Sequence, residues 1–166
     1  QQGAPYHVYN APADLAAAAF FSYVNVVRGV SRGALTDTPF GQFLTPGLPD
    51  GAPVDIVIRP QHLRIDFDRK GRGPLPTETD GVAARARVER ARFMGRESLV
   101  EFVCEHDGTR LKATVPSVFL PKPGTPLWLT IRRDRCFVFP AAGGAAADIA
   151  TGACAPMAEP PARAAE

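Results

Sequence analysis

The sequence predicts an all-β fold, a barrel or a sandwich, with one short helix near the N-terminus. Apolar and polar residues alternate within short runs, which is the pattern of half-buried strands. Turn residues such as Asp-Gly and Pro-Gly separate these runs about every 8–12 residues, as in barrels and sandwiches. The sequence has no long apolar stripe with helical spacing. Short strands are therefore expected to make up most of residues 24–140.

The elements follow from this alternation in chain order. A helix is predicted from Leu15 to Phe21, because Pro12 suits a first helical turn and alanines follow it. The strands are expected around Val54, Ile56 and Ile58 on one face, then Val82, Ala84, Ala86 and Val88, then Leu111, Ala113 and Val115, then Leu127, Leu129 and Ile131, and finally Cys136 to Phe139. The Asp-Gly pair within His106–Thr109 predicts a hairpin turn.

Composition suggests three parts. Residues 1–23 read as a linker with the short helix, and the abrupt start suggests a piece of a longer protein. Residues 24–140 form the predicted β domain, and the glycines, prolines and charges of 70–81 suggest a connector between two half-barrels. Alanine, glycine and proline dominate 141–166, which predicts a disordered tail.

The bulk numbers bound the function classes. The chain has 166 residues, 45% of them hydrophobic, and a net charge of +2. This charge gives no global basic field of the kind that a non-specific nucleic-acid binder shows. The three cysteines, Cys104, Cys136 and Cys154, form no Cys-x-x-Cys pair, so inert thiols in a reducing compartment are expected rather than a disulfide framework or a zinc site.

Catalytic motifs are missing from the sequence. No Gly-x-x-x-x-Gly-Lys-Ser/Thr loop is present to hold the phosphates of ATP, and no serine lies in a Gly-x-Ser-x-Gly elbow. His62, Asp66 and Asp68 share one face of a predicted strand and could form a metal cluster. We favour the alternative, an exposed polar strand face, and predict no metal, cofactor or catalytic residue.

Two arginine-rich stripes have several possible uses. The first contains Arg85, Arg87, Arg90, Arg92 and Arg96 with Glu89 and Glu97 among them, and the second contains Arg132, Arg133 and Arg135 around Asp134. A solvated outer face or a protein interface is favoured, because few aromatic residues lie between the arginines to stack on bases. A small anion pocket remains an alternative, since guanidinium groups bind oxyanions well.

The Arg59-Pro60 pair marks the end of a strand. Proline has no N–H to donate to a β-ladder, and it favours an extended backbone in the preceding residue. Arg59 should therefore stand at a junction, where its guanidinium can hold carbonyls or a carboxylate. We favour this structural role for Arg59, Pro60 and Gln61 over a ligand-binding role.

Short motifs occur in an order that resembles a known family. They are Gln2-Gly3-Ala4-Pro5 with Val8-Tyr9 and Pro12, Ala19-Phe20 with Asn25, Thr38-Pro39-Phe40-Gly41, Ile58-Arg59-Pro60-Gln61, Phe93-Met94-Gly95-Arg96-Glu97, and Pro123-Gly124 with Leu127-Trp128-Leu129. Their order and spacing resemble those of TOBE domains, the small β-barrel modules at the C-terminus of the ATP-binding subunits of ABC importers. The ferric-iron and polyamine types are more similar than the molybdate type, although Gln61 replaces the usual glutamate.

The resemblance implies an OB-like barrel, or two half-barrels, with a regulatory and dimerising function. It implies a homodimer, the ATPase domain of the same chain and, indirectly, membrane permease subunits as partners, and no nucleic acid. It also implies that the subunit lies in the cytoplasm at the inner membrane, beneath the permease. ATP and Mg would be bound only by the ATPase domain. The strand with Arg85, Arg87 and Glu89 is the expected dimer contact. The alternative is a ligand-sensing module that binds a small anion or a metal and inhibits transport.

Overall fold

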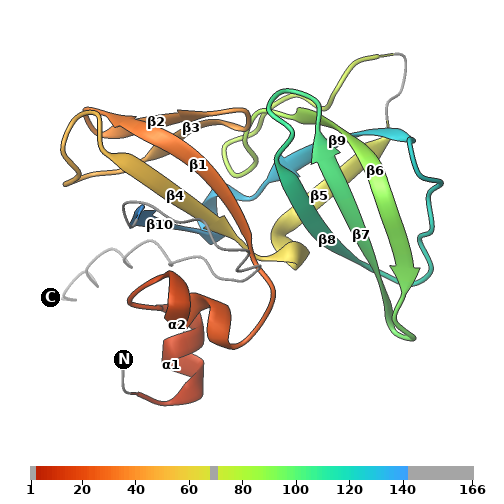
Figure 1. Cartoon of the computed structure of the whole chain (residues 1–166), viewed down its shortest axis with the longest axis horizontal. Coiled ribbons are helices and arrows are strands. Elements are labelled where there is room, and N and C mark those ends of the chain that lie inside the picture. The colour runs from red at the N-terminus through yellow and green to blue at the C-terminus, as the bar shows by residue number, and fades with distance from the viewer. Residues whose placement is uncertain (1–2, 68–70, 142–166) are drawn as a thin grey trace, which may run out of the picture.

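Two antiparallel β-sheets of five strands each form most of the molecule in a computed structural model, which describes residues 3–67 and 71–141 (Figure 1). The first has the order β10-β4-β1-β2-β3 and the second the order β5-β9-β6-β7-β8. The strands of the first sheet are β1 (Asn25–Arg32), β2 (Leu35–Thr38), β3 (Gly41–Leu44), β4 (Pro53–Ile58) and β10 (Cys136–Pro140). Those of the second are β5 (Leu63–Phe67), β6 (Ala84–Phe93), β7 (Glu97–Cys104), β8 (Arg110–Pro116) and β9 (Pro126–Ile131). The predicted all-β class is confirmed.

The N-terminal part contains two α-helices, where the sequence predicted one. Helix α2 (Leu15–Phe20) is the predicted one, and the Asp14 side chain accepts a hydrogen bond from Ala17 N at 2.7 Å as its N-cap. Helix α1 (Pro5–Asn10) was missed, since a single short segment carries too little apolar periodicity to be recognised. Within the described ranges, no helix is long and apolar enough to cross a membrane.

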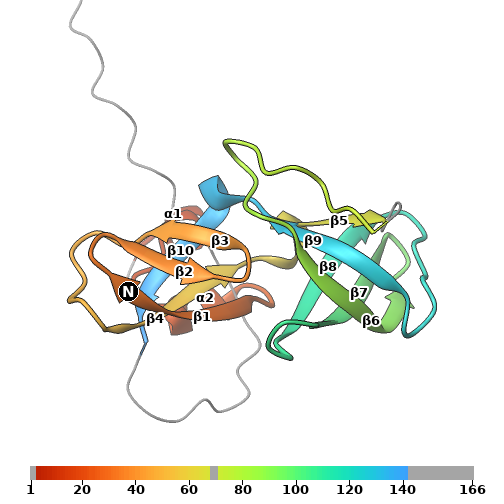
Figure 2. The same ribbon diagram turned by 90° about the horizontal axis from the view of Figure 1, so that it is seen from above.

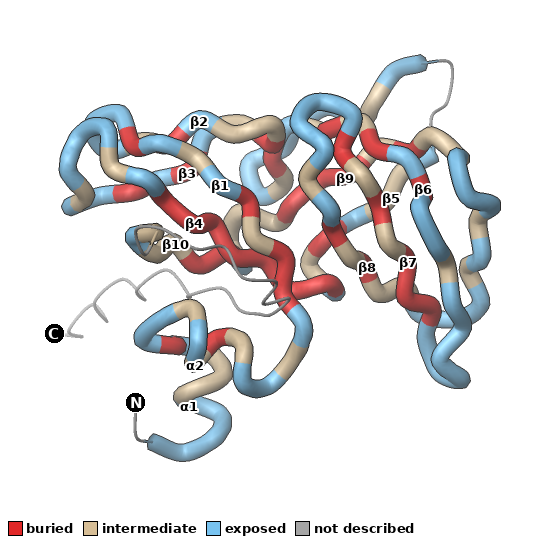
Figure 3. The backbone as a smooth tube through the Cα atoms, in the orientation of Figure 1, coloured by how far each residue is buried: buried red, intermediate tan, exposed pale blue. Residues whose placement is uncertain are grey.

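The alternation is clearest in β6 and fails in β4. In β6, Ala84, Ala86 and Val88 are buried while Arg87 and Glu89 are exposed. In β4, Val54, Ile56 and Ile58 are buried as predicted, but Asp55 and Val57 between them are buried too. Strand β4 pairs with β10 on one side and β1 on the other, and the helices lie beside this sheet (Figure 3).

The second sheet curls until its end strands β5 and β8 contact each other, as in a small barrel (Figure 2). The chain passes from the first sheet to the second through the 3-10 helix η1 (Pro60–His62) and returns through η2 (Arg133–Arg135). The segment 71–83, which contains most of the predicted connector, instead joins β5 to β6 within the second sheet. No local pattern marks this change of sheet, because it needs only one turn.

This segment nevertheless links the two sheets. Val82 N donates to Phe40 O, and Gly81 N donates to Ile131 O, each at 3.0 Å. A side chain at Gly81 would collide with the backbone of Phe40, so this approach requires glycine.

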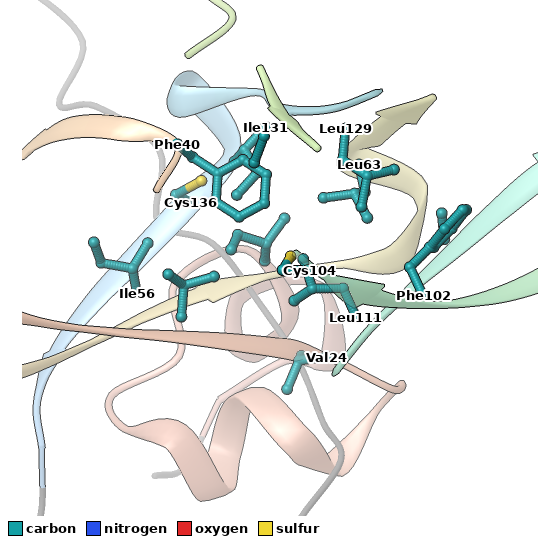
Figure 4. Packing of buried hydrophobic residues seen from close by; sticks show 14 of the residues in the cluster. Val24, Phe40, Ile56, Leu63, Phe102, Cys104, Leu111, Leu129, Ile131 and Cys136 are labelled. Atoms are coloured by element: carbon teal, nitrogen blue, oxygen red, sulfur yellow. The ribbon is translucent and has the colours of Figure 1, made fainter. Parts of the chain in front are cut away.

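One hydrophobic cluster runs through both sheets (Figure 4). Phe40 and Ile131 meet at the junction, and Cys136 and Cys104 are buried free thiols of β10 and β7. Cys104 ends β7, and Cys136 begins the last strand as predicted. Burial raises the pKa of Cys104 to about 12, which removes thiolate reactivity at neutral pH. Cys154 and the predicted tail from residue 142 lie outside the described residues.

The turn predicted at His106–Thr109 is also confirmed. It joins β7 to β8, and the Asp107 carboxylate accepts hydrogen bonds from both the backbone N and the hydroxyl of Thr109. Gly108 takes a φ of 73°, the conformation that favours glycine at this position.

Candidate functional site

The site begins at the end of β4, where Arg59 precedes Pro60. Arg59 has an extended backbone with φ −75° and ψ 147°, and Pro60 opens η1. This is the geometry expected of a residue before proline. The Arg59 side chain is turned into the molecule, and the residue is only 2% exposed.

Arg59 holds the N-terminal helices against the sheets. Its Nη2 donates to Tyr9 O at 2.8 Å, and its Nη1 donates to the hydroxyl of Ser22 at 3.1 Å. The guanidinium carbon also lies 3.1 Å from the centre of the Tyr9 ring. One arginine thus joins the end of α1, the segment after α2 and the end of β4.

Gln61 reaches the same tyrosine. Its Nε2 lies 3.1 Å from the Tyr9 hydroxyl and donates a hydrogen bond to it. The three predicted junction residues, Arg59, Pro60 and Gln61, therefore lie together around Tyr9. The sequence did not identify Tyr9 and Ser22 as their partners, because contacts so distant along the chain leave no local pattern.

The Arg59 charge is buried without a carboxylate. In the part of the chain that the structure describes, its hydrogen-bond acceptors are a carbonyl and a hydroxyl. Burial lowers the pKa of Arg59, and Tyr9 acts in the opposite direction. A buried charge is costly unless it is hydrogen-bonded, so Tyr9 and Ser22 must stay in place for this arrangement to be stable.

His62 lies on the same turn and is held neutral. Burial lowers its pKa, as do the positive charges of Arg135, Arg59 and Arg132, while Asp134 partly opposes them. Its Nδ1 atom is buried and has no hydrogen-bond partner among the described residues.

The metal cluster around His62, the less favoured alternative in the sequence, is not seen in the part of the chain that is described. No group of three His, Cys, Asp or Glu side chains is gathered there in a way that could hold a metal. Asp66 lies on β5, and Asp68 lies outside the described residues.

The second arginine stripe forms a compact ion-pair group at η2. Arg132 binds the Asp134 carboxylate through Nε at 3.0 Å and through Nη2 at 2.6 Å. Arg135 lies 3.4 Å from the same carboxylate. Burial acts to raise the pKa of Asp134, but the hydrogen bonds and charges of the two arginines outweigh it and lower that pKa. This ion-pair group lies at η2, where the chain returns from β9 to the first sheet.

The first arginine stripe lies on β6, a central strand rather than an edge. Arg87 binds Glu105 at 2.7 Å, and Arg85 lies 3.5 Å from the same carboxylate. Arg92 binds Glu101 at 3.1 Å, and Glu89 binds Arg110 at 2.8 Å. Arg96 lies in the turn after β6 and is exposed. Within the described residues the stripe is largely exposed to solvent, and most of its charges are paired across strands.

Asn25 is a second link between the sheets, which the sequence analysis had treated only as part of a motif. Its side-chain Nδ2 donates to Lys112 O at 2.8 Å, and Lys112 N donates to Asn25 Oδ1 at 2.6 Å. The amide group thus pairs with β8 as a neighbouring strand would. Asn25 is 3% exposed and begins β1, so it joins the two sheets.

Comparison with known proteins adds family membership to this geometry. The model of the TOBE domain family matches residues 56–139. The Fe(3+) ions import ATP-binding protein FbpC of Streptomyces avermitilis is 33% identical over 125 residues, which are 75% of this chain and 32% of that protein. The sulfate/thiosulfate import ATP-binding protein CysA 1 of Chromobacterium violaceum is 31% identical over 148 residues, 88% of this chain and 40% of that protein.

Among solved structures, the cytoplasmic molybdate-binding protein ModG with molybdate bound aligns with a TM-score of 0.49 and 15% identity. The alignment covers 72% of this chain and 95% of the ModG chain. The chain spans well under half the length of the two import proteins. The family match covers half of the sequence, including Arg59 and both 3-10 turns. The chain therefore belongs to the TOBE domain family, and its curated relatives are ATP-binding subunits of ABC importers.

Proposed function

We propose that this chain is the regulatory and dimerisation domain of the ATP-binding subunit of an ABC importer of the ferric-iron or polyamine type. The observation that carries the proposal is the Arg59 junction, which binds α1 and the segment after α2 to the β-sheets. In the resembling subunits this helical segment follows the ATPase domain. If the junction holds this helical segment rigidly, movements of the ATPase domain would be transmitted to the two β-sheets.

The proposed partners follow from the same reading. They are a second copy of the subunit, the ATPase domain of the same chain and, through that domain, the membrane permease. ATP and Mg would bind to the ATPase domain, and the subunit would work on the cytoplasmic side of the inner membrane. The ferric-iron type is supported by the similarity to FbpC, at an identity close to that of the sulfate relative.

A hybrid subunit tests the junction. The C-terminal part of the Streptomyces avermitilis iron-import subunit is replaced by this chain, and ATP hydrolysis is measured in membranes that contain the cognate permease. We expect the hybrid to hydrolyse ATP in response to the transported substrate, and R59A to weaken that response. R32A is the matched control, because the Arg32 side chain is 81% exposed on the first sheet and its partner Asp37 is exposed as well. Equal responses in the two variants would refute a coupling role for the junction.

Nucleotide binding by the chain alone is a simpler test. Since the sequence has no phosphate-binding loop, we expect no saturable ATP binding at micromolar concentrations in isothermal titration. Saturable ATP binding by the chain alone would contradict the proposal that ATP binds to the ATPase domain.

The ligand-sensing alternative is separated by titration. Sulfate, molybdate and ferric citrate are added to the purified chain, and its melting temperature is followed. A regulatory and dimerising domain without a ligand predicts no specific shift, whereas a sensor is stabilised by whatever binds its folded state. A saturable shift with one of these compounds would favour the sensor.

A further inference from the structure

Strand β6 continues beyond the point where its pairing with β9 ends. Strand β9 pairs with β6 from Ala84 to Arg87, and Val88 then bonds to Thr125 O and Gly124 N. From there β6 runs on to Phe93 beside β7, well past the start of β9 (Figure 1). The last part of β6 therefore has one side that no strand covers.

The register decides which backbone groups face that free side. Met94 N donates to Glu97 O at 2.8 Å, so this pair is hydrogen-bonded. Bonded and non-bonded pairs alternate along an antiparallel ladder, so Arg92 and Arg90 also bond to β7. Ala91 and Phe93 consequently direct their N–H and C=O groups away from β7. Within the described residues, these four groups have no hydrogen-bond partner.

The chain before β9 does not pair with this part of β6 within the described residues. A turn from Lys122 to Thr125, closed by a hydrogen bond from Thr125 N to Lys122 O at 3.1 Å, leads into β9 and bonds to β6 at Val88. Gly124 allows the turn with a φ of 84°, and Pro121 and Pro123 have no N–H with which to pair. The edge is left open by the local sequence.

Large apolar side chains are exposed on the two segments that adjoin this edge. Phe93 is 45% exposed, Met94 60%, Val118 64% and Leu120 53%. They come from the turn after β6 and from the loop after β8. An exposed apolar group of this kind beside free backbone groups is typical of an interaction site.

The loop after β8 is fixed rather than loose. The buried hydroxyl of Ser98 donates to Ser117 O at 2.9 Å and accepts from Phe119 N at 2.8 Å. These bonds hold Ser117 at a φ of 69°, a conformation that costs free energy in a residue other than glycine. The exposure of Val118 and Leu120 is therefore imposed by the fold.

The charges around the edge are mainly positive. Arg90, Arg96 and Lys122 are exposed and have no ion pair within the described ranges, and Glu97 is the acidic residue among them. A second copy of the chain would present the same positive charges at this edge and would be repelled. A partner that carries negative charges would be attracted.

We propose that the edge of β6 from Arg90 to Phe93 binds an extended, acidic segment of a partner protein as an added strand. The backbone groups of Ala91 and Phe93 bond to the segment, which places its alternate side chains on opposite faces. One set packs on Phe93 and Val118, and the acidic set faces Arg90 and Arg96. This surface is separate from the Arg59 junction and goes beyond the proposed regulatory and dimerising function.

Fluorescence anisotropy with a labelled peptide of alternating glutamate and valine tests the site. We expect saturable binding, and a loss of about tenfold in affinity for the double variant R90E/R96E, as for the loss of about one charged hydrogen bond. R32E is the matched control, because the Arg32 side chain is 81% exposed on the first sheet. Equal binding by the two variants, or equal binding of a lysine-valine peptide, would overturn the acidic specificity.

Two further measurements test the added strand itself. A91P removes an N–H that faces the free edge and leaves the bonds to β7 intact, and N-methylation of the peptide blocks the same contact from the other side. Both should weaken binding while circular dichroism of A91P stays unchanged. Undiminished binding of the N-methylated peptide would overturn strand addition even if A91P failed to fold. Two other results would reassign the surface. If the chain binds vesicles of anionic lipid and F93S abolishes this while peptide binding persists, the surface binds a membrane. If the chain self-associates and F93S abolishes this while peptide binding persists, the surface binds a second copy.

Discussion

The Arg59 junction and the outer face of β6 both depend on arginine, and they use it in opposite ways. Arg59 is 2% exposed, has neutral acceptors and stacks on Tyr9. Arg87 on β6 is exposed and paired with the carboxylate of Glu105. The outer face of β6 has more ion pairs than the Arg59 junction, but solvent screens those exposed charges and they add little stability.

The difference teaches that burial, not pairing, decides what an arginine contributes. When a buried donor is removed, its acceptors have neither a protein partner nor water. Each unsatisfied acceptor then lowers the free energy of unfolding. Removing an exposed partner lets water replace it. Four substitutions, taken from the largest expected effect to the smallest, test this contrast.

R59A should lower the free energy of unfolding by roughly 1–3 kcal/mol, because Tyr9 O and the Ser22 hydroxyl lose their donor. Urea unfolding measures the change, and R87A is the matched control on the exposed face. The helices should also become more accessible to protease, since Arg59 holds them to the sheets. Equal unfolding midpoints for R59A and wild type would mean that Arg59 is not a structural junction.

N25L should cost about 1–2 kcal/mol, because both backbone groups of Lys112 that bond to Asn25 are left unpaired. N25D is the informative companion, since it keeps an acceptor for Lys112 N, loses the donor to Lys112 O and buries a carboxylate against that oxygen. We therefore expect N25D to be at least as destabilised as N25L in urea unfolding at neutral pH. If N25L were as stable as wild type, the two sheets would not depend on this link.

The sequence predicted the periodic parts of the fold and missed the contacts between them. Alternation along Ala84–Val88 and the Asp-Gly turn at 107–108 are local patterns, and each was found where expected. Tyr9 reaches Arg59 across 50 positions and Asn25 reaches Lys112 across 87, so neither pairing leaves a local signal. The Arg-Pro pair fixed where Arg59 stands, because proline constrains its neighbour, but it could not name the partner.

The same limit explains the sheet boundary. The sequence placed a division near 70–81, where composition changes, whereas the chain changes sheet at the short turns η1 and η2. Strand order is set by pairing between distant segments, and composition does not record it. The edge of β6 was missed for this reason as well, since it depends on where β9 stops.

His62 should make stability depend on pH. Its pKa is lowered by burial and by Arg135, Arg59 and Arg132 from an ordinary value of 6.5. The unfolded chain therefore binds the proton more tightly, and the free energy of unfolding should fall as the pH drops below about 6.5. Urea unfolding at pH values on either side of this point should show a smaller fall for H62Q than for wild type. H106Q, at an exposed turn, is the control, and an equal fall in H62Q and wild type would contradict the assignment.

R87A should have the smallest effect, about 0–1 kcal/mol, although Arg87 and Glu105 form one of the shortest ion pairs in the described part of the chain. Arg85 remains 3.5 Å from the same carboxylate, so Glu105 keeps a positive neighbour after the substitution. The effect should shrink further in 1 M salt, because exposed charges are screened over about 3 Å there. Urea unfolding at low and high salt measures both values. A loss as large as that of R59A, and insensitive to salt, would show that pairing rather than burial controls these arginines and would reverse the comparison.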